Sequence, residues 1–395
     1  MNNNNFALMR YLRDLGLDAH LFLFDNEIEH FMPESDTWEL PRWSPFIHRL
    51  DFGNNPRHLL LRWRRLAAAF VGFEYVVGSG LTPALFHRAG KRLDLFYPYS
   101  PGVEYFDAVW MAGMFDTAGW AKRLFYRFVR KHQARGIQGA RSCTNLDMGG
   151  KTEAALARLG RSFHRISVPM VYPGDEVALS ALPEWLCQLI QDATAHRLSI
   201  VSHSRQHWIR PDGYSAEEWR VATKHNDYLL RGFAAYCQRV PTANPLLLLF
   251  DYGKDVEASK ALIGELGIAP RVRWVPRCSR REILQLLRRA DVCVAEFMEE
   301  GIWGGTAWEA LACGRPVIQS VNFSGEGYRA FAGQDLPPIL AARSTEDVTR
   351  HLLALHADEA GRMRVGDAGS RWFQENNGRK LAAKYVDIIR KDLGR

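Results

Sequence analysis

The second half of the chain alternates short apolar runs with amphipathic stretches, and this pattern limits its fold more than any other feature. Five runs are expected to be strands: Leu198–Ser202, Leu246–Asp251, Val272–Val275, Val292–Ala295 and Pro316–Ser320. The stretches between them have helical spacing, notably Asp227–Arg239, Val256–Leu266 and Arg280–Ala290. Such alternation predicts a doubly wound α/β domain, a parallel sheet with helices on both faces.

The first half shows the same alternation in a weaker form. Phe6–Leu15 has helical spacing, and Ala19–Phe24, Tyr75–Val77 and Leu93–Tyr97 have the composition of strands. A chain of 395 residues is long for one compact domain and comfortable for two. The proline- and glycine-containing segment Val168–Gly174 is the expected linker.

We therefore expect an N-terminal Rossmann-like domain over residues 1–173 and a C-terminal one over residues 174–371. Residues 372–395 are expected to form a C-terminal helix that packs back on the N-terminal domain. Apolar residues at helical spacing predict one continuous amphipathic helix from Trp372 to Leu393.

The strongest local signal is the segment Glu300–Ile318, which predicts a glycine-rich loop, a short helix and the start of a strand. Glycines allow the backbone to approach a ligand, and the free N–H groups of a helix start attract a diphosphate. Glu309 could accept hydrogen bonds from the vicinal hydroxyls of a ribose. Thr306 and Glu309 also fit a capping box, which would satisfy the first backbone N–H groups of the helix instead.

Within this segment, Glu309-Ala-Leu-Ala-Cys-Gly-Arg-Pro-Val317 resembles the donor site of the glycosyltransferase family 4 group. The resemblance is good from about Ser199 to the C-terminus and weaker before it. It implies the GT-B fold, an α/β architecture of two facing Rossmann-like domains with the active site in the cleft between them. It also implies transfer of a sugar from a nucleotide-diphosphate sugar held by the C-terminal half, with no further cofactor.

The resemblance implies particular roles for the residues of the donor side. Arg205 and Lys224 resemble the family's cations on the donor diphosphate, where positive charge offsets the charge on the leaving group. A solvated surface cation is the alternative at each position. The expected donor-binding residues are Gly301, Trp303, Gly304, Gly305, Thr306, Glu309, Gly253 and Pro276.

One departure from the family concerns its pair of glutamates, which are separated by seven residues. The first of the pair contacts the donor sugar in the family, but Gly301 occupies that register here and Glu300 is one position away. Either the loop has an extra residue and Glu300 reaches the sugar as a catalytic group, or the role is absent, as in a branch whose loop reads Gly-x-x-Gly.

The acceptor side of the cleft is expected to come from the N-terminal half. Its candidate residues are Asn4, Ser79, Gly80, Tyr99 and Asp147. The family often has a histidine near this position. This chain has Ser79 and Gly80 there instead, so no catalytic histidine can be carried over from the family. An asparagine and aspartate pair such as Asn145 and Asp147 more often shapes a turn.

A second departure concerns the start of the sequence. The family has a strand ahead of the loop that Asn2–Asn5 would form, whereas this sequence begins inside that loop. Loss of an interior strand leaves its two neighbours with unpaired edges. We expect either a start site further upstream or an N-terminal domain in which something else fills the gap.

Charge is unevenly distributed along the first half. Thr117–Leu146 contains no Asp or Glu, and its cations are Lys122, Arg123, Arg127, Arg130, Lys131, Arg135 and Arg141. Trp120–Lys131 mixes cations with aromatic residues, as does a helix on an anionic membrane, and residues 120–141 are the expected contact. An ordinary amphipathic helix with solvated cations is the alternative. No recognised motif predicts a nucleic-acid partner.

These features predict a hexosyltransferase that acts on a glycan or lipid-linked acceptor in bacterial surface polysaccharide or lipopolysaccharide synthesis. The absence of Asp-x-Asp favours a reaction without a metal, and the family implies retention. No secretory signal or apolar stretch of about 18 residues is found, which predicts a cytoplasmic protein, with the inner face of the cytoplasmic membrane as a second expectation. The alternatives are a non-catalytic sugar-nucleotide-binding scaffold and a sugar-nucleotide 2-epimerase.

Overall fold

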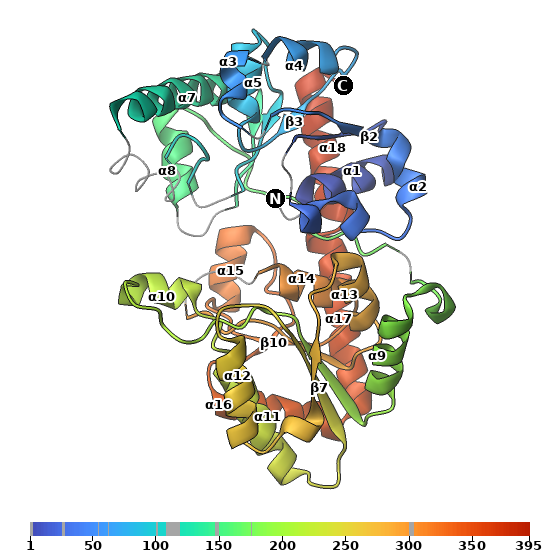
Figure 1. The fold of residues 1–395 in the computed structure, drawn as a ribbon. Helices are drawn as coiled ribbons and strands as arrows, with labels where there is room; N and C mark the ends of the chain where they lie inside the picture. The colour runs from blue at the N-terminus through green and yellow to red at the C-terminus, as the bar shows by residue number, and fades with distance from the viewer. Residues whose placement is uncertain are drawn as a thin grey trace.

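The computed structural model describes residues 3–25, 28–53, 55–61, 63–99, 102–107, 119–146, 150–174, 176–299 and 304–395. These residues form two lobes, with the N-terminal lobe at the top of Figure 1 and the C-terminal lobe at the bottom. Both lobes contain parallel β-sheet flanked by helices.

The C-terminal lobe contains a six-stranded parallel sheet in the order β11-β10-β9-β6-β7-β8. Its strands are β6 (Leu198–Ser202), β7 (Pro245–Phe250), β8 (Val272–Val275), β9 (Val292–Val294), β10 (Val317–Gln319) and β11 (Leu340–Ala341). The five strands expected from the apolar runs are confirmed, each within one residue at either end. Strands β6 and β7 are buried along their whole length, which explains why their sequences are nearly continuous apolar runs.

Helices cover both faces of this sheet. They are α9 (Glu184–Thr194), α10 (Ala216–Ala222), α11 (Asn226–Arg239), α12 (Val256–Glu265), α13 (Arg280–Leu287), α14 (Gly305–Ala312), α15 (Gly325–Ala332), α16 (Thr345–Ala357) and α17 (Glu359–Asn376). Short 3-10 turns precede α9 and β8, at Leu179–Ala181 and Ala269–Arg271. Leu246, Leu248 and Phe250 of β7 enter one core, and Leu247 and Leu249 enter the other.

The order of the strands reverses beside β6, because β7 and β8 lie on one side of it and β9, β10 and β11 lie on the other. In an open parallel sheet, ligands bind outside the carboxyl ends of the strands at such a reversal. The residues that follow β6 and β9 are therefore the first place to look for a site.

The N-terminal lobe contains two separate parallel sheets. One has the order β3 (Val77–Gly78), β4 (Leu95–Phe96), β5 (Ser142–Cys143), and the other pairs β1 (Leu21–Leu23) with β2 (Ile47–Arg49). The helices are α1 (Asn4–Asp14), α2 (Leu40–Trp43), α3 (His58–Leu61), α4 (Trp63–Ala69), α5 (Thr82–Arg88), α7 (Trp120–Gly139) and α8 (Lys151–Arg158). Three 3-10 turns lie between β1 and β2, at Glu29–Phe31, Pro33–Ser35 and Ser44–Phe46.

Helix α1 begins at Asn4, so the expectation of a loop through Asn2–Asn5 is wrong for Asn4 and Asn5. Its N-cap, Asn3, has a left-handed backbone with φ of 54°, a conformation that asparagine adopts more readily than most residues. The apolar face of α1 buries Phe6, Leu8 and Met9.

Helices α5 and α7 pack closely because a glycine lies at their crossing. A Cβ added to Gly136 of α7 would lie 2.1 Å from the carbonyl oxygen of Pro83, so no larger residue fits. The buried Gln133, one turn earlier, donates to the carbonyl oxygen of Gly80 at 2.7 Å and accepts from the N–H of Ala84 at 3.1 Å. Helix α7 therefore fixes the loop that follows β3.

The expectation of one continuous helix from Trp372 to Leu393 is wrong. Helix α17 ends at Asn376, and α18 (Arg379–Leu393) begins after a turn at Gly378, whose N–H still donates to the carbonyl oxygen of Phe373. A Cβ at Gly378 would lie 2.9 Å from Gln374 Oε1, so the turn is tight. The turn lets the chain pass from the C-terminal to the N-terminal lobe (Figure 1).

Helix α18 packs against the N-terminal lobe. Leu381 and Tyr385 share an apolar cluster with Leu8 of α1 and Leu95 of β4. The hydroxyl of Tyr385 also donates to the carbonyl oxygen of Ser167 at 3.0 Å. Of the helices in the described ranges, none combines the length and the apolar character needed to cross a bilayer.

Candidate functional site

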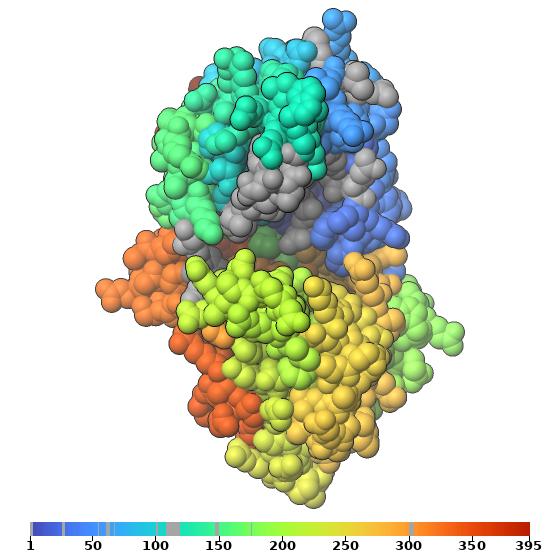
Figure 2. Space-filling view, turned by 60° about the vertical axis from the view of Figure 1, so that its left-hand side comes forward, coloured from blue at the N-terminus to red at the C-terminus, as the bar shows by residue number. Residues whose placement is uncertain are grey.

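The candidate site lies where the strand order reverses, at the junction of the lobes, and Figure 2 shows a recess there. His203 to His207 follow β6 at this edge. Gly253 makes an isolated parallel bridge with Gln206, and a Cβ at Gly253 would lie 2.3 Å from the carbonyl oxygen of Gln206. Because φ of Gly253 is 121°, this close approach needs glycine, which holds the loop after β6 in place.

Helix α14 points its N-terminal end at the same edge of the sheet. Its N-cap is Gly304, and the backbone gives Thr306 the second helical position. Gly304 makes no side-chain cap and Thr306 lies inside the helix rather than at its N-cap, so the capping-box interpretation of Thr306 and Glu309 is wrong. Its first N–H groups therefore have no side-chain acceptor within the described residues, the arrangement in which helix starts bind anions.

Glu309 of α14 lies in a network of buried charges. Its Oε2 is 2.7 Å from Nε2 of His203, and its Oε1 accepts from Nε of Arg280 at 2.7 Å. Burial by itself raises the pKa of Glu309, but the charge of Arg280 and the hydrogen bond of His203 outweigh it and lower that pKa to about 2. Glu309 is therefore ionised throughout the neutral range.

The network continues into the N-terminal lobe. Arg280, the first residue of α13, reaches Asp36 at 3.3 Å and donates to the carbonyl oxygen of Met170 at 3.2 Å. Asp36 also pairs with the buried Arg10 of α1 and accepts from Nδ2 of Asn3. A continuous path of ionic contacts thus joins α14 to α1.

This network bears on the ribose role that the sequence predicts for Glu309. Only 6% of Glu309 is exposed, and each of its carboxylate oxygens already accepts one hydrogen bond. Each oxygen keeps one more lone pair. The hydroxyls of a ribose could therefore donate only to these remaining lone pairs. The ribose role of Glu309 stays a prediction.

Lys224, which precedes α11, lies at the same edge. Its Nζ is 2.6 Å from Oε2 of Glu296, the second residue after β9, and 3.3 Å from Sδ of Met298. A Cβ on Gly304 would lie 3.2 Å from the same Glu296 oxygen. Lys224, Glu296 and the start of α14 therefore converge on one small region.

The other predicted donor-side residues differ in their surroundings. Arg205 and Pro276 are exposed at the ends of β6 and β8, and the described residues offer Arg205 no hydrogen bond or ion pair. Gly305 and Thr306 are partly exposed in the first turn of α14. Glu300, Gly301 and Trp303 lie outside the described residues.

Several buried polar atoms at this edge have no hydrogen-bond partner among the described residues. They are Ser202 Oγ, His203 Nδ1, Ser204 Oγ and Thr306 Oγ1. Buried polar atoms in proteins are nearly always paired, and leaving one unpaired costs about 1–3 kcal/mol. Their concentration at the strand reversal indicates a place prepared for a polar ligand.

On the N-terminal side, three of the five predicted acceptor residues lie together. A Cβ on Gly80 would contact the ring of Tyr99 at 3.1 Å, and Ser79 hydrogen bonds to Tyr97. Asn4 is buried in the first turn of α1, and its Oδ1 has no hydrogen-bond partner among the described residues. Asp147 lies outside the described residues.

The sequence reasoning missed five residues of this region: Asp36, His203, Arg280, Glu296 and His30. His203 and Glu296 follow strands directly, and that position is the signal which could have found them. Burial lowers the pKa of His30, and the nearby charge of Arg280 lowers it further, so a neutral imidazole faces the network from the N-terminal lobe.

In the described part of the chain, no group of three or more His, Cys, Asp and Glu side chains is arranged to hold a metal.

Comparison with known families places the strongest likeness in the C-terminal lobe. Residues 220–369 match the family described as glycosyl transferases group 1, which confirms the resemblance drawn from the α14 segment. A D-inositol 3-phosphate glycosyltransferase of Mycobacterium sp. (strain KMS) is 35% identical over 98 residues, 24% of this chain and 21% of that protein. One from Mycolicibacterium gilvum is 44% identical over 57 residues, 14% and 13% of the two chains. The alignments thus span only about a fifth or less of these relatives.

Solved structures resemble the chain over nearly its whole length. Anabaena Alr3699/HepE in complex with UDP has a TM-score of 0.59 and 13% identity, covering 99% of this chain and 96% of that one. A glycosyltransferase from Rickettsia africae has a TM-score of 0.58 and 13% identity, with coverages of 99% and 94%. At this identity the likeness concerns the fold alone, and the expected GT-B fold is confirmed.

Replacement of Glu309 by glutamine tests the buried network. A carboxylate whose pKa is lowered stabilises the fold above its ordinary pKa of about 4.3, and this contribution is lost as the pH falls toward about 2. At pH 7 we expect Glu309→Gln to lower the free energy of unfolding by roughly 3–5 kcal/mol, because it removes the nearer of the two carboxylates that compensate the buried Arg280 and leaves only Asp36. The cost should shrink below about pH 4.

The measurement is urea unfolding of both proteins at pH 7 and pH 3. Glu265→Gln, at an exposed position of α12, removes the same charge outside the network and should change little at either pH. A cost for Glu309→Gln that is equally large at both pH values would contradict ionic stabilisation of Glu309.

Proposed function

We propose that this chain, whose C-terminal lobe matches the group 1 glycosyl transferases, moves a sugar from a nucleotide-diphosphate sugar to a glycan or lipid-linked hydroxyl. The setting would be bacterial surface polysaccharide or lipopolysaccharide synthesis in the cytoplasm. Solved proteins of the same fold contain UDP, or UDP with glucose, which supports a nucleotide-sugar donor.

One observation carries the proposal: unpaired hydroxyls and an uncapped helix start meet at the strand reversal. Ser204 follows β6 and Thr306 lies in the first turn of α14, and the hydroxyls of both lack partners among the described residues. A diphosphate offers the oxygens that hydroxyls, N–H groups and a helix dipole favour. The β6 and α14 loops would thus hold the diphosphate between them.

The charged residues at this edge suit departure of a nucleoside diphosphate. Lys224 is held at the site by Glu296, and Arg205 is exposed beside it, so both cations can turn to the donor. In the proposed reaction the bond from the anomeric carbon to the diphosphate oxygen breaks, and the acceptor oxygen bonds to the same face of that carbon. The acceptor proton passes to the departing diphosphate, so no side-chain base and no metal is required.

Two other functions fit parts of the same site. A non-catalytic scaffold would bind the nucleotide sugar without turning it over, and a 2-epimerase would invert carbon 2 of the sugar and release no glycoside. Release of nucleoside diphosphate from the donor, followed by NMR of the sugar product, separates all three. Retention of configuration at the anomeric carbon can be read from the same spectra.

The donor site is tested by replacing the unpaired hydroxyl. Thr306→Val keeps the shape of the side chain and removes an oxygen that has no partner among the described residues, so the stability of the protein should not fall. A hydrogen bond to a charged group is worth about 1.5–3 kcal/mol, so nucleotide affinity should fall about tenfold or more. The measurement is calorimetry with UDP, GDP, ADP and dTDP and their common sugars.

The matched control is Thr242→Val, at an exposed threonine between α11 and β7. This variant should bind the nucleotide with the affinity of the unchanged protein. Equal affinity of Thr306→Val and the unchanged protein would contradict the assignment of the diphosphate to this edge. If no nucleotide binds, the proposed function is wrong as a whole.

We further propose that the start of α7 contacts an anionic membrane during the reaction. Trp120 and Leu124 are 81% and 60% exposed, and Lys122, Arg123 and Arg127 are exposed beside them. This end of α7 projects at the outer edge of the N-terminal lobe (Figure 1). Exposed apolar side chains next to cations are what binding to an anionic bilayer surface requires.

Sedimentation with vesicles tests this contact. The protein should pellet with phosphatidylglycerol vesicles and much less with phosphatidylcholine vesicles, and high salt should reduce the pelleted fraction. Trp120→Ala with Leu124→Ala should weaken pelleting at low salt, whereas Met363→Ala, which truncates an exposed apolar side chain of α17, should not. Equal pelleting of the double variant and the unchanged protein would contradict a role for α7.

A further inference from the structure

One histidine beside the proposed donor site has an unusual pair of partners. His225, the N-cap of α11, has a carboxylate near each of its ring nitrogens. Its Nδ1 lies 3.7 Å from Oδ1 of Asp227, and its Nε2 lies 3.3 Å from Oε1 of Glu299. No other histidine in the described ranges faces carboxylates through both nitrogens.

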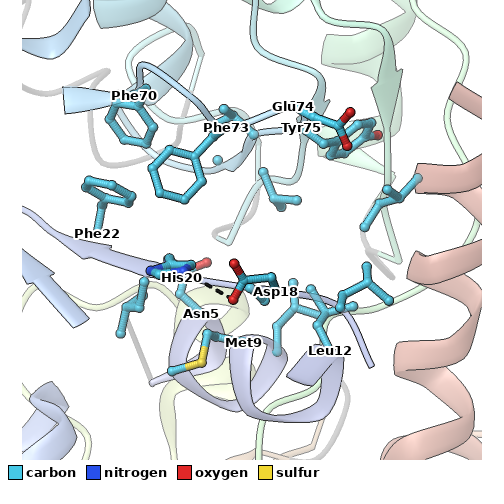
Figure 3. Close-up of a pocket in the computed structure, with 18 of the residues that line it drawn as sticks. Asn5, Met9, Leu12, Asp18, His20, Phe22, Phe70, Phe73, Glu74 and Tyr75 are labelled. Carbon is cyan, nitrogen blue, oxygen red and sulfur yellow. Dashed lines mark ion pairs between the residues drawn. The ribbon is translucent and has the colours of Figure 1, made fainter. Parts of the chain in front are cut away.

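His20, in the wall of a cavity of about 900 Å³ in the N-terminal lobe, shows a different arrangement. Its Nε2 pairs with Asp18 at 3.3 Å, the dashed line in Figure 3, whereas its Nδ1 lies 2.8 Å from Nε2 of His48. A neutral imidazole suits these two partners, because one of its nitrogens donates and the other accepts. Both partners of His225 are acceptors, and only an imidazolium donates to both.

The backbone and the ring of His225 are both held in place. The backbone is left-handed, with φ of 41° and ψ of 48°, a conformation that is strained in residues other than glycine. Its N–H donates to Oγ1 of Thr223 at 3.2 Å. Its ring is stacked on that of Tyr228, with the centroids 4.5 Å apart and the planes inclined by 3°. Such strain persists only where the surroundings fix it, and here the two nitrogens are left facing Asp227 and Glu299.

Glu299 belongs to the segment between β9 and α14, which backbone hydrogen bonds attach to the start of α11. The N–H of Phe297 donates to the carbonyl oxygen of Lys224 at 3.2 Å. The N–H of Glu299 donates to the carbonyl oxygen of Arg220 at 3.0 Å. The same segment carries Glu296, which pairs with Nζ of Lys224 and lies beside the N-cap of α14. A shift of this segment would therefore displace Lys224 from the region in front of α14.

We propose that His225 is a positioning residue for the nucleotide-diphosphate sugar, and that nucleotide affinity falls when its ring loses the proton that lets it bridge Asp227 and Glu299. This inference rests on the proposed donor site at the strand reversal. The bridge joins the start of α11 to the segment after β9, and so keeps Glu296 where it holds Lys224 at the site. The ring of His225 thus acts through Glu299 and not by contact with the donor.

The charges around His225 favour its protonated form. Burial by itself lowers the pKa of His225, but the hydrogen bonds and the charges of Asp227 and Glu299 outweigh it and raise that pKa above its ordinary value of about 6.5. The bridge is therefore fully present below about pH 6.5 and is lost as the pH rises through the raised pKa. Tyr228 stays neutral over this range, because burial and the same two carboxylates raise its pKa.

Neighbouring cations limit the size of the effect. Nε of Arg220 lies 3.6 Å from Oε2 of Glu299, so part of the attachment remains when His225 is neutral. Lys224 is paired with Glu296 and not with the carboxylates of the bridge. The side chain of Glu299 is 47% exposed, so water screens its pairing with His225. We therefore expect a change in nucleotide affinity of about threefold.

The test is calorimetry of the full chain at pH 6.0 and pH 8.5 with UDP-glucose, GDP-glucose, ADP-glucose and dTDP-glucose. Their diphosphates are esterified at both ends and keep a constant charge over this range. The unchanged protein should bind about threefold more tightly at pH 6.0. His225→Asn keeps a residue that tolerates the left-handed backbone but has no charge, and it should bind equally weakly at both pH values. The matched control His351→Asn, on α16, should keep the pH dependence.

A second measurement follows the bridge without any nucleotide. Hydrogen–deuterium exchange at residues 296–299, corrected for the intrinsic rate at each pH, should show about threefold less protection at pH 8.5 than at pH 6.0. His225→Asn and Glu299→Gln should each remove this difference, and the two together should do no more than either alone. Glu299→Gln changes a half-exposed side chain, so this variant should fold as the unchanged protein does.

The outcomes separate this inference from the proposed function. Affinity that is equal at both pH values, with binding intact, would overturn the role of His225 and leave the donor site standing. A pH dependence that persists in His225→Asn would overturn it as well, because another group would then be responsible. If none of the four nucleotide sugars binds at either pH, the proposed function is wrong, and the role of His225 in donor binding is wrong with it.

Discussion

The two lobes depend on a chain of buried charges in which Arg280 stands between Glu309 and Asp36. Each of these three side chains is less than a tenth exposed, so each charge needs its partner. Removing one member leaves its buried neighbours with less compensating charge, which costs more than the loss of a surface ion pair would. The network therefore sets the position of α14 relative to the N-terminal lobe.

The proposed donor site follows from that position. Helix α14 carries Glu309 in the buried network and presents its uncapped start, with Thr306, to the strand reversal. His203 connects the network to the loop after β6, because its Nε2 contacts Glu309 while its neighbour Ser204 has an unpaired hydroxyl. The buried charges and the proposed diphosphate site thus lie on the same two segments, the loop after β6 and helix α14. A ligand that shifts these segments would therefore also shift the buried charges.

Much of the C-terminal lobe could be predicted because its strands are buried on both faces and appear as apolar runs in the sequence. The edge proposed to bind the donor could be predicted for the same reason, since it follows from strand order. What the sequence could not show are contacts between distant segments, such as Arg280 with Asp36, and the pairing of Lys224 with Glu296. The break between α17 and α18 was also missed, since helical spacing continues through Gly378 and only the crossing between lobes requires a turn there.

The central claim is that a nucleoside diphosphate binds at the strand reversal, between the loop after β6 and the start of α14. The most direct measurement is hydrogen–deuterium exchange of the full chain with and without saturating UDP. The account predicts slower exchange at residues 203–206 and 304–307, where backbone N–H groups would meet the diphosphate. Protection confined to the N-terminal lobe, with these two segments unchanged, would contradict it.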